Sequence, residues 1–335
     1  MPAKDRLFSG MQPTQDAHIG NWLGAIRGWV DLQDRYECLF GVVDLHALTV
    51  PFEAAKMPDR VLNLAAAFLA CGLDPKRSTI FVQSAVPEHA ELSWLLACQT
   101  GLGALERMTQ FKDKSEQNAA NINAGLLFYP VLMAADVLAY RAKAVPVGED
   151  QVQHLELARE IARKFNRAFG ETFPEPKAIV PEGAAKRILG LDGNAKMSKS
   201  RGNAVALVEE PAEIRRLVGG AFTDPEKKRK NDPGRPEVCN VYTLHGFFTD
   251  AGRRASIERD CRSGALGCVD CKKSLSEGIV AALAPIRERY LAIRGDEGGL
   301  RKVLAEGAVR ARALARETLA LARERMGLRE GGRIP

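Results

Sequence analysis

The fold is indicated most clearly by Leu7-Phe8-Ser9-Gly10-Met11-Gln12-Pro13-Thr14, together with the segment that starts at His18. The apolar start of this stretch predicts a β-strand, and its glycine and proline predict a turn. From Ile19 to Val30, apolar residues then recur at the spacing of one helix face. The beginning of the chain therefore predicts a strand, a turn and a helix in direct succession.

The same order continues through residues 1–150, where short apolar runs alternate with helical patterns. This alternation is the one expected of a parallel sheet covered by helices on both faces. We therefore expect an α/β fold with a Rossmann-like parallel sheet. Further strands are predicted at 38–43, 79–82 and 145–147, and helices at 59–71 and 155–169.

The composition changes near residue 170, where three prolines lead into a loop rich in glycine and lysine at 190–203. Such a break is typical of a domain junction. Beyond Val205 the patterns are mostly helical and end in a long Ala/Arg/Leu-rich helix at about 300–326. We expect a catalytic domain at 1–205 and an α-helical domain at 206–335.

The overall composition excludes some classes of protein. No run of eighteen apolar residues is present, and the first residues lack the layout of a secretory signal, so we expect a cytoplasmic protein. The chain has 48 basic and 42 acidic residues, and the net charge of +6 permits a polyanionic partner without requiring one. The basic run at 227–230 could bind phosphates or could be an ordinary solvated charge run.

The turn from Gly10 into the helix at His18 is a candidate phosphate site. A helix N-terminus presents unpaired N–H groups and a partial positive charge. Gly20 would let a ligand lie against the backbone, and His18 adds a donor for negative charge that develops on a phosphate. A single His-x-Gly at a helix start is usually incidental, so this interpretation depends on a second signature.

That second signature is Lys196-Met197-Ser198-Lys199-Ser200, about 175 residues further along the chain. Two lysines three positions apart in a Gly/Ser-rich loop could place both ammonium groups on one pyrophosphate, and the serines could add hydroxyls. The alternative is a solvated basic loop. The two signatures in this order indicate ATP that is cleaved between its α and β phosphates.

His18-Ile19-Gly20-Asn21 and the KMSKS run resemble the two signatures of class I aminoacyl-tRNA synthetases, with Asn21 where many members have histidine. The resemblance to the bacterial tryptophanyl-tRNA synthetase family covers essentially the whole chain. Its segments, besides residues 8–14, are Gln110-Phe111-Lys112, Tyr129-Pro130-Val131-Leu132-Met133-Ala134-Ala135-Asp136 and Val145-Pro146-Val147-Gly148-Glu149-Asp150-Gln151.

The resemblance implies a site for ATP and Mg²⁺ on its phosphates. The residues expected along ATP are Gly10, Gln12, Thr14, His18, Gly20, Asn21, Gly148, Asp150, Lys196, Met197, Ser198 and Lys199. Those expected to take part in catalysis are His18, Gly20, Asn21, Lys196, Ser198 and Lys199. The reaction implied is attack of the amino-acid carboxylate on the α-phosphate, followed by transfer of the aminoacyl group to tRNA.

The amino-acid site follows from the chemistry of tryptophan, whose large apolar indole carries a single N–H donor. Its pocket needs apolar walls and one buried acceptor, and Asp136 in its apolar segment fits that acceptor. The resemblance implies that Tyr129 and Gln151 hold the α-amino group. The residues expected to bind tryptophan are Phe8, His46, Tyr129, Met133, Asp136, Val145, Val147 and Gln151.

The resemblance also implies the partners tRNA(Trp) and a second copy of the chain in a homodimer. Three alternatives remain at this stage. A tyrosyl-tRNA synthetase shares both signatures, a small-molecule adenylate-forming enzyme belongs to the same superfamily, and a paralogue could bind RNA without catalysis. The long helical region after residue 205 favours an RNA partner.

The seven cysteines form two groups. Cys38, Cys71 and Cys98 stand in apolar runs and are expected in the core. Four others, separated by 21, 6 and 2 residues, fall in polar sequence: Cys239, Cys261, Cys268 and Cys271. Clustered cysteines in a cytoplasmic protein favour metal over disulfides.

The metal itself is left open by the spacing of these four cysteines. It suits a [4Fe-4S] cluster better than zinc, which usually takes two close Cys-x2-4-Cys pairs, and free thiols remain an alternative. The motif also resembles the cluster motif of a subset of tryptophanyl-tRNA synthetases, with one residue fewer in the first gap.

Overall fold

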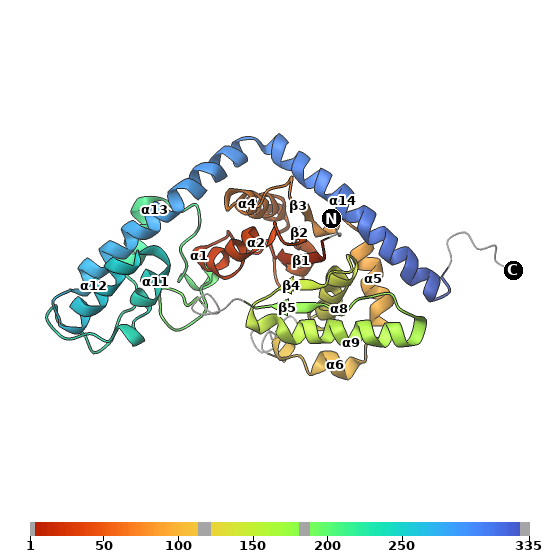
Figure 1. Ribbon diagram of the computed structural model, residues 1–335, viewed down its shortest axis with the longest axis horizontal. Helices are drawn as coiled ribbons and strands as arrows, with labels where there is room; N and C mark the ends of the chain where they lie inside the picture. The colour runs from red at the N-terminus through yellow and green to blue at the C-terminus, as the bar shows by residue number, and fades with distance from the viewer. Residues whose placement is uncertain (1–3, 113–121, 181–187, 329–335) are drawn as a thin grey trace. The chain divides into compact units, whose positions relative to one another are not determined.

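The computed structural model describes residues 4–112, 122–180 and 188–328, and within them a parallel β-sheet forms the centre of the fold. The strand order is β3-β2-β1-β4-β5, and each neighbouring pair is parallel (Figure 1). The strands are β1 (Arg6–Met11), β2 (Glu37–Val42), β3 (Ser78–Val82), β4 (Ala144–Pro146) and β5 (Lys177–Ile179). The expected α/β fold is confirmed.

Both faces of the sheet are buried, as the apolar strands require. On one face Trp29 stacks on Phe40 of β2, with ring centroids 5.0 Å apart. On the other face Phe8 of β1 stacks on Tyr140, with centroids 5.6 Å apart, and Phe81 of β3 meets the same tyrosine edge-on at 5.7 Å. Tyr140 is therefore a central contact of the core on the second face.

The helices differ in length from three residues to 29. Those of residues 19–106 are α1 (Ile19–Asn21), α2 (Arg27–Leu32), α3 (Asp44–Ala47), α4 (Met57–Ala70), α5 (Glu88–Ala97) and α6 (Leu102–Glu106). The later ones are α8 (Ala124–Leu138), α9 (Val152–Phe169), α10 (Pro211–Gly219), α11 (Asn240–Phe248), α12 (Ala251–Arg262), α13 (Cys268–Gly295) and α14 (Glu297–Arg325). None of the helices in the described ranges is long and apolar enough to cross a lipid bilayer.

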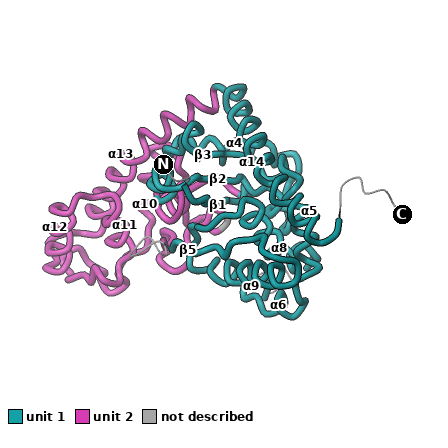
Figure 2. Tube along the Cα trace, turned by 45° about the vertical axis from the view of Figure 1, so that its right-hand side comes forward, with its two compact units in different colours: residues 1–14, 28–181, 296–335 teal, residues 15–27, 182–295 magenta. Residues whose placement is uncertain are grey.

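The chain divides into two compact units, coloured separately in Figure 2. The first contains the sheet and consists of residues 1–14, 28–181 and 296–335, and the second consists of residues 15–27 and 182–295. This division differs from the sequence-based boundary at residue 205. The reason is that α14 packs on β3, where Gly307 allows contact that a Cβ atom, 1.8 Å from the Ile80 carbonyl oxygen, would prevent.

Two local details also differ from expectation. The predicted helix after His18 is not one regular helix, because a wide π-type turn, η1 (Trp22–Ile26), separates α1 from α2. The edge strand β5 was not predicted, because three residues beginning with a lysine carry no alternation of apolar and polar residues. The predicted long helices, α4, α9 and α14, lie within a few residues of their expected bounds.

Candidate functional site

The two phosphate-binding signatures lie next to each other in the second unit. Residues 17–19 run beside residues 205–207, just after the KMSKS run. The Ile19 N–H donates to the Val205 carbonyl at 3.0 Å, and the Leu207 N–H donates to the Ala17 carbonyl at 2.9 Å. His18 is the residue between these two bonds, in an isolated bridge with Ala206. Backbone hydrogen bonds between segments far apart in the sequence therefore place the expected catalytic histidine beside the KMSKS loop.

Gly20 lies at the closest point between the two signatures. A Cβ atom at this position would lie 3.0 Å from the His18 ring and 3.1 Å from the Met197 Cβ atom. Met197 is only 3% exposed, so it is a packing residue that holds the KMSKS run against α1. Asn21 closes the start of α1, since its Oδ1 atom accepts the His18 N–H at 3.1 Å. The asparagine thus has a structural task at this position.

The KMSKS loop is held by hydrogen bonds of Asn203, a residue that was not predicted from the sequence. The Asn203 Oδ1 atom accepts the Ser198 N–H at 2.8 Å, and its Nδ2 atom donates to Asp192 at 2.9 Å. Lys199 pairs with Asp16, and the Lys196 side chain is exposed. No pattern marks Asn203 in the sequence, because its role depends on contacts with residues 5 and 11 positions away.

The surroundings of His18 disfavour the protonated, charged form of its ring. Burial, followed by the positive charges of Lys196 and Lys199, lowers the pKa of His18 to about 4. The ring is therefore neutral near pH 7, and its Nδ1 atom has no hydrogen-bond partner among the described residues. Two lysines and a buried, unpaired histidine nitrogen form a site that a polyphosphate would complete.

We expect inorganic tripolyphosphate to raise the pKa of His18, because its negative charges offset those of the two lysines. An NMR titration of the histidine ring signals checks this, with a free-protein value near 4. The folded-state pKa lies below the unfolded value of 6.5, so the unfolded chain binds more protons and stability falls as the pH drops from 6.5 towards 4. A pKa near 6.5 without tripolyphosphate would contradict the described environment.

The first unit contains a buried carboxylate at the expected amino-acid site. Asp136 on α8 is 1% exposed and accepts hydrogen bonds on both oxygens. Gln83 Nε2 donates to Oδ1 at 2.7 Å, and His89 Nδ1 donates to the same oxygen at 2.6 Å. His46 Nε2 donates to Oδ2 at 2.7 Å. These bonds use three of the roughly four lone-pair directions of a carboxylate, which leaves one for a further donor.

The electrostatics of Asp136 keep it ionised. Burial alone would raise the pKa of this carboxyl, but its interactions with His46 and then His89 outweigh burial and lower the pKa to about 2. His89 extends the network, since its Nε2 atom lies 2.6 Å from the Tyr140 hydroxyl. The result is a fixed anion in the core whose position depends on three side chains from other elements.

Gln83 and His89 were not predicted from the sequence, whereas His46 was. Gln83 directly follows β3, and His89 is the second residue of α5. The end of a parallel strand is a common position for site residues, and this signal could have identified Gln83. His89 carries no such signal, because only the folded chain brings α5 to α8.

The expected apolar walls lie in the same core. Phe8 is 4% exposed and Val145 is 2% exposed, and both belong to the hydrophobic cluster that contains Tyr140. Met133 and Val147 are half-buried. The four side chains are therefore in the unit that holds Asp136, and Met133 is three positions before it on α8.

Polar residues expected at the amino-acid and ATP sites form a second network in the first unit. The Tyr129 hydroxyl donates to Gln110 Oε1 at 3.1 Å and lies 2.8 Å from His154 Nε2. Gln110 Nε2 donates to the Asp150 carbonyl at 3.1 Å, and Gln151 Nε2 donates to the Asp150 carboxylate at 2.9 Å. Tyr129, Asp150 and Gln151 are thus brought together, with Gln110 as the link between them.

The remaining residues expected along ATP in this unit follow β1 and β4. Gln12 and Thr14 are half-buried after β1, and Gly148 precedes the turn at Asp150. Gly10 permits close packing, since a Cβ atom there would lie 2.6 Å from Val43. Their roles towards ATP stay predictions.

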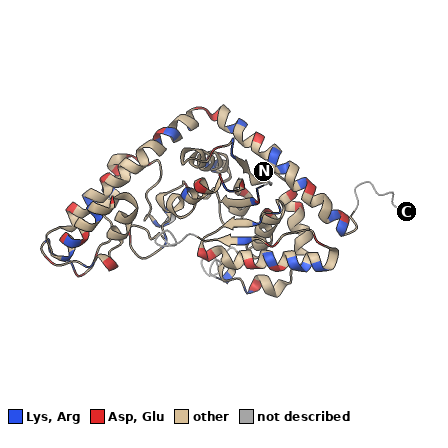
Figure 3. Cartoon of the chain, in the orientation of Figure 1, with Lys and Arg blue, Asp and Glu red and all other residues tan. Residues whose placement is uncertain are grey.

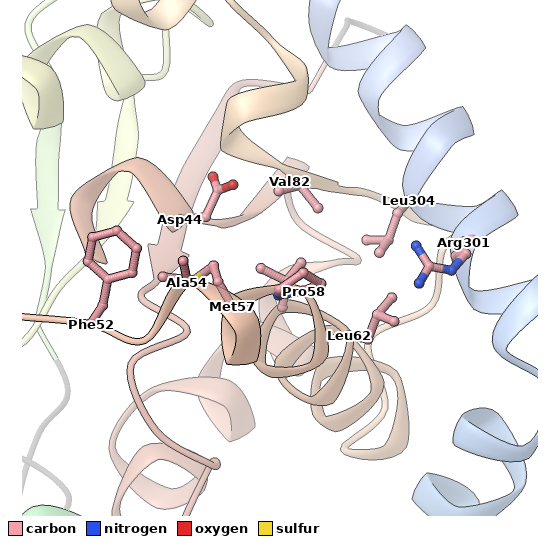
Figure 4. Close-up of a pocket in the computed structure, with 10 residues that line it drawn as sticks. Asp44, Phe52, Ala54, Met57, Pro58, Leu62, Val82, Arg301 and Leu304 are labelled. Carbon is pink, nitrogen blue, oxygen red and sulfur yellow. The ribbon is translucent and has the colours of Figure 1, made fainter. Parts of the chain in front are cut away.

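A surface pocket of about 500 Å³ lies elsewhere in the first unit, and none of the expected site residues lines it. Figure 4 shows Leu304 and Arg301 of α14 on one side and Leu62 of α4 on the other. Asp44 at its edge is already bonded to the Ser84 N–H and hydroxyl. The pocket therefore does not contain the expected amino-acid site, whose position at Asp136 stays a prediction.

The four cysteines expected to bind metal lie near one another in the second unit. Burial raises the pKa of the Cys271 thiol to about 12, and the next causes are the neighbouring thiols of Cys239, Cys261 and Cys268. The four are free of disulfides. Within the described ranges, however, no group of three or more potential ligands is close enough to hold a metal ion. The thiols are neighbours without a ligating geometry.

The other cysteines fit the expectation of core positions only in part. Cys38 is buried and Cys71 is half-buried, but Cys98 is exposed. The expectation for Cys98 was wrong because it follows α5 on the same face as Trp94, four positions earlier, whose side chain is 66% exposed. The apolar run around Cys98 therefore includes an exposed helix face.

The chain is similar to known proteins over nearly its whole length. The family model for tRNA synthetases class I (W and Y) matches residues 3–284. A tryptophan–tRNA ligase of Deinococcus radiodurans is 48% identical over 326 residues, which is 96% of this chain and 98% of the relative. Another, from Wolinella succinogenes, is 44% identical over 329 residues, with 97% and 99% covered.

Among solved structures, tryptophanyl-tRNA synthetase from Campylobacter jejuni complexed with ADP and tryptophan is similar over nearly the full length. The TM-score is 0.86 at 36% sequence identity, and the match covers 96% of this chain and 100% of that one. The likeness therefore includes both compact units.

Proposed function

This chain belongs to the class I tRNA synthetases of the W and Y family, and we propose that it joins L-tryptophan to tRNA(Trp) with ATP. The observation that carries the assignment is the match of nearly the whole chain to tryptophan–tRNA ligases at 44–48% identity. Tryptophan is first activated to tryptophanyl-adenylate with release of pyrophosphate. The tryptophanyl group is then transferred to the tRNA.

We propose that the second unit supplies the charge stabilisation for adenylate formation. The tryptophan carboxylate attacks the α-phosphate, the bond between the α and β phosphates breaks, and pyrophosphate leaves with the electron pair. Lys196 and Lys199 offset the charge that develops on the pyrophosphate, and His18 donates a hydrogen bond once phosphate has raised its pKa. No covalent enzyme intermediate is needed, since positioning and electrostatics suffice.

Mg²⁺ enters with ATP in this proposal, as a counter-ion of the phosphates. Within the described ranges no cluster of acidic side chains could hold the ion by itself. The ATP phosphates would therefore provide most of its ligands, as is common for Mg²⁺, and the lysines would act beside the ion as point charges. The Mg²⁺ ion itself supplies further neutralisation of phosphate charge when it is bound.

We propose that Asp136 selects tryptophan through its remaining acceptor direction. Its other directions are filled by Gln83, His46 and His89, which hold the carboxylate in place. A substrate with a ring N–H completes the set of four, whereas phenylalanine would leave an acceptor unpaired in the core. Phe8, Met133, Val145 and Val147 are proposed as the walls for the indole, and Tyr129 and Gln151 as contacts of the α-amino group.

The function is tested by pyrophosphate exchange with each of the twenty amino acids, followed by aminoacylation of tRNA(Trp). Exchange that depends on tryptophan alone is expected. Exchange that depends on tyrosine would identify a tyrosyl-tRNA synthetase. Exchange without charging of any tRNA would favour a small-molecule adenylate-forming enzyme, and the absence of exchange would indicate a non-catalytic relative.

We propose that the helices α10 to α13, within the helical region after residue 206, contact the tRNA anticodon. Residues 228–230 of the basic run are exposed there, which supports a polyanionic partner. Lys227 does not contribute to that surface, because its ammonium group is buried and donates to the Lys230 and Asp232 carbonyls.

A homodimer is also proposed, and the exposed Trp94 and Leu102 in the first unit support an apolar interface.

We further propose that Cys239, Cys261, Cys268 and Cys271 bind a [4Fe-4S] cluster, with zinc as the second candidate and free thiols as the third. Their spacing and their gathering in one unit support this proposal. The absence of a ligating group in the described ranges means that side chains must move for any metal to bind. The cluster would support the fold of the second unit, since the reaction moves no electrons.

Anaerobically purified protein is expected to absorb at about 400 nm and to lose this band on oxidation. Cys268→Ser should remove the band and about four equivalents of iron. The matched control is Cys98→Ser, which changes an exposed cysteine of the first unit and should leave both unchanged. A colourless protein with stoichiometric zinc would favour the second candidate, and a metal-free protein would leave the thiols free.

A further inference from the structure

The buried carboxylate of Glu88 is the observation from which this inference starts. Glu88 is the first residue of α5, and it is only 6% exposed although it is charged. Its Oε1 atom accepts a hydrogen bond from the Nε atom of Arg312 and from that of Arg316, each at 2.9 Å. Both arginines belong to α14, so two guanidinium groups from the last helix meet at one oxygen of α5.

The position of Glu88 in the sequence connects this cluster to the amino-acid site. The next residue is His89, whose ring donates to Asp136 at 2.6 Å and is itself fully buried. A shift of the first turn of α5 would therefore move the His89 ring and change the hydrogen bond on which the Asp136 position depends. Hydrogen bonds of this length leave little room for such a shift.

The packing of α14 fits a positioning role. Its small apolar residues Ala311, Ala315 and Ala322 belong to the same hydrophobic cluster as Tyr140, which contacts the other side of the His89 ring. Both signs of charge occur along α14 (Figure 3), but its arginines at 312 and 316 are directed to a buried partner. The helix thus contacts the His89 surroundings through its apolar face and through its arginines.

Burial of the charged Glu88 carboxylate is unfavourable in free energy, so a contribution to stability alone does not explain its position. Its Oε2 atom is buried and has no hydrogen-bond partner among the described residues. A buried carboxylate with one unpaired oxygen loses hydration that its two arginines only partly replace. Burial would raise the pKa of Glu88, but the arginines outweigh it and lower the pKa, so the group remains an anion.

A second ion pair between the same helices provides a comparison. Arg323 of α14 donates to Glu91 of α5 at 2.7 Å, but the Glu91 side chain is 45% exposed and lies one turn further along α5. Exposed ion pairs of this kind contribute little to the free energy of unfolding. Glu91 is also not adjacent in sequence to any residue of the Asp136 network. The two pairs therefore differ in burial and in their connection to His89.

We propose that Glu88, Arg312 and Arg316 are positioning residues that fix the start of α5 and, through His89, the orientation of Asp136 towards tryptophan. This inference rests on the proposed function, because it assigns the cluster to the amino-acid half of that reaction. The three side chains do not touch the substrate. They act on the affinity for tryptophan and not on the ATP chemistry.

The test compares Glu88→Gln with the matched control Glu91→Gln in tryptophan-dependent pyrophosphate exchange. Glu88→Gln keeps the volume and removes the charge, and the KM for tryptophan should rise roughly 10- to 100-fold while the KM for ATP stays within about twofold. Glu91→Gln should change neither constant by more than about twofold. Arg312→Lys, which keeps a positive charge, should rescue most of the loss seen in Arg312→Ala.

A double-mutant comparison shows whether the residues act as one group. Arg316→Ala and Glu88→Gln together should raise the KM for tryptophan no more than the larger single effect, because both remove the same contact. Thermal unfolding of each variant identifies any that is not folded at the assay temperature. Additive effects, or equal effects of Glu88→Gln and Glu91→Gln, would overturn the proposal.

A readout without substrate separates this inference from the proposed function. The NMR signals of the His89 ring should shift in Glu88→Gln and stay unchanged in Glu91→Gln. If the wild-type protein does not activate tryptophan, the proposed function fails, and the ring signals alone decide whether the cluster positions His89. Unchanged His89 signals in Glu88→Gln would refute the positioning role in either case.

Discussion

Replacement of Asp136 by alanine is expected to lower kcat/KM for tryptophan in pyrophosphate exchange by roughly 10⁴-fold, with little change in the affinity for ATP. The carboxylate is the only acceptor proposed for the indole N–H, and it is 1% exposed, so water cannot replace it. Discrimination against phenylalanine should be lost at the same time. Equilibrium binding of tryptophan and of ATP, measured separately, checks both parts of the prediction.

The alanine variant also removes the acceptor of Gln83, His46 and His89. A buried donor left without a partner costs about 1–3 kcal/mol, so the variant will be less stable and its folding must be measured. Asp136→Asn is the matched variant, because it keeps the volume and one acceptor oxygen. Its amide N–H groups face donors, so tryptophan activation should still fall by at least roughly 10²-fold. A fall in ATP affinity with amino-acid selectivity intact would refute the assignment.

The Asp136 network shows where prediction from the sequence ends. Asp136 itself could be predicted, because a carboxylate in an apolar segment needs a reason to be there. Gln83 and His89 could not be assigned to it, since they come from the end of β3 and from α5. Their bonds depend on how these elements pack on α8, and no local pattern encodes that packing.

The fold shows the same limit. β1 to β3, α4, α9 and α14 follow from local periodicity, which a single stretch of sequence contains. The division into two units does not follow from local periodicity. It depends on α14, which packs on the sheet of the first unit although it is far from the strands in sequence. The helical pattern of residues 300–326 is correct in type, but its packing partners, β3 and α5, could not be predicted from it; the close approach of Gly307 to Ile80 shows the contact with β3.

The residues of the two signatures were predicted from the sequence to act on phosphates. The protonation state of His18 and the ion-pair partner of Lys199 could not be predicted from it. His18 was expected to act as a donor towards negative charge on a phosphate, and burial and the two lysines hold its ring neutral near pH 7 with a pKa of about 4. Lys199 was expected to place its ammonium group on a pyrophosphate, and in the structure it pairs with Asp16.

The second large effect is expected for the lysines of the KMSKS run. Lys196→Ala and Lys199→Ala should each lower kcat of tryptophan-dependent pyrophosphate exchange by roughly 10²- to 10³-fold. The reason is that their charges are needed most when the pyrophosphate separates, so the loss affects the transition state more than the bound ground state. The KM for tryptophan should change less than about threefold, because the amino-acid site has other contacts.

Asp16→Asn is the matched variant that separates the ion pair of Lys199 with Asp16 from the role of Lys199 in the reaction. Asp16 pairs with Lys199 through a half-exposed contact, which is worth about 0–1 kcal/mol. Release of the lysine should therefore lower the KM for ATP by up to about fivefold and leave kcat almost unchanged. If Asp16→Asn lowered kcat as strongly as Lys199→Ala does, the pair itself and not the free ammonium group would be the catalytic element. The assignment of Lys199 to the pyrophosphate would then fail, because a lysine that must stay bound to Asp16 cannot follow the leaving group.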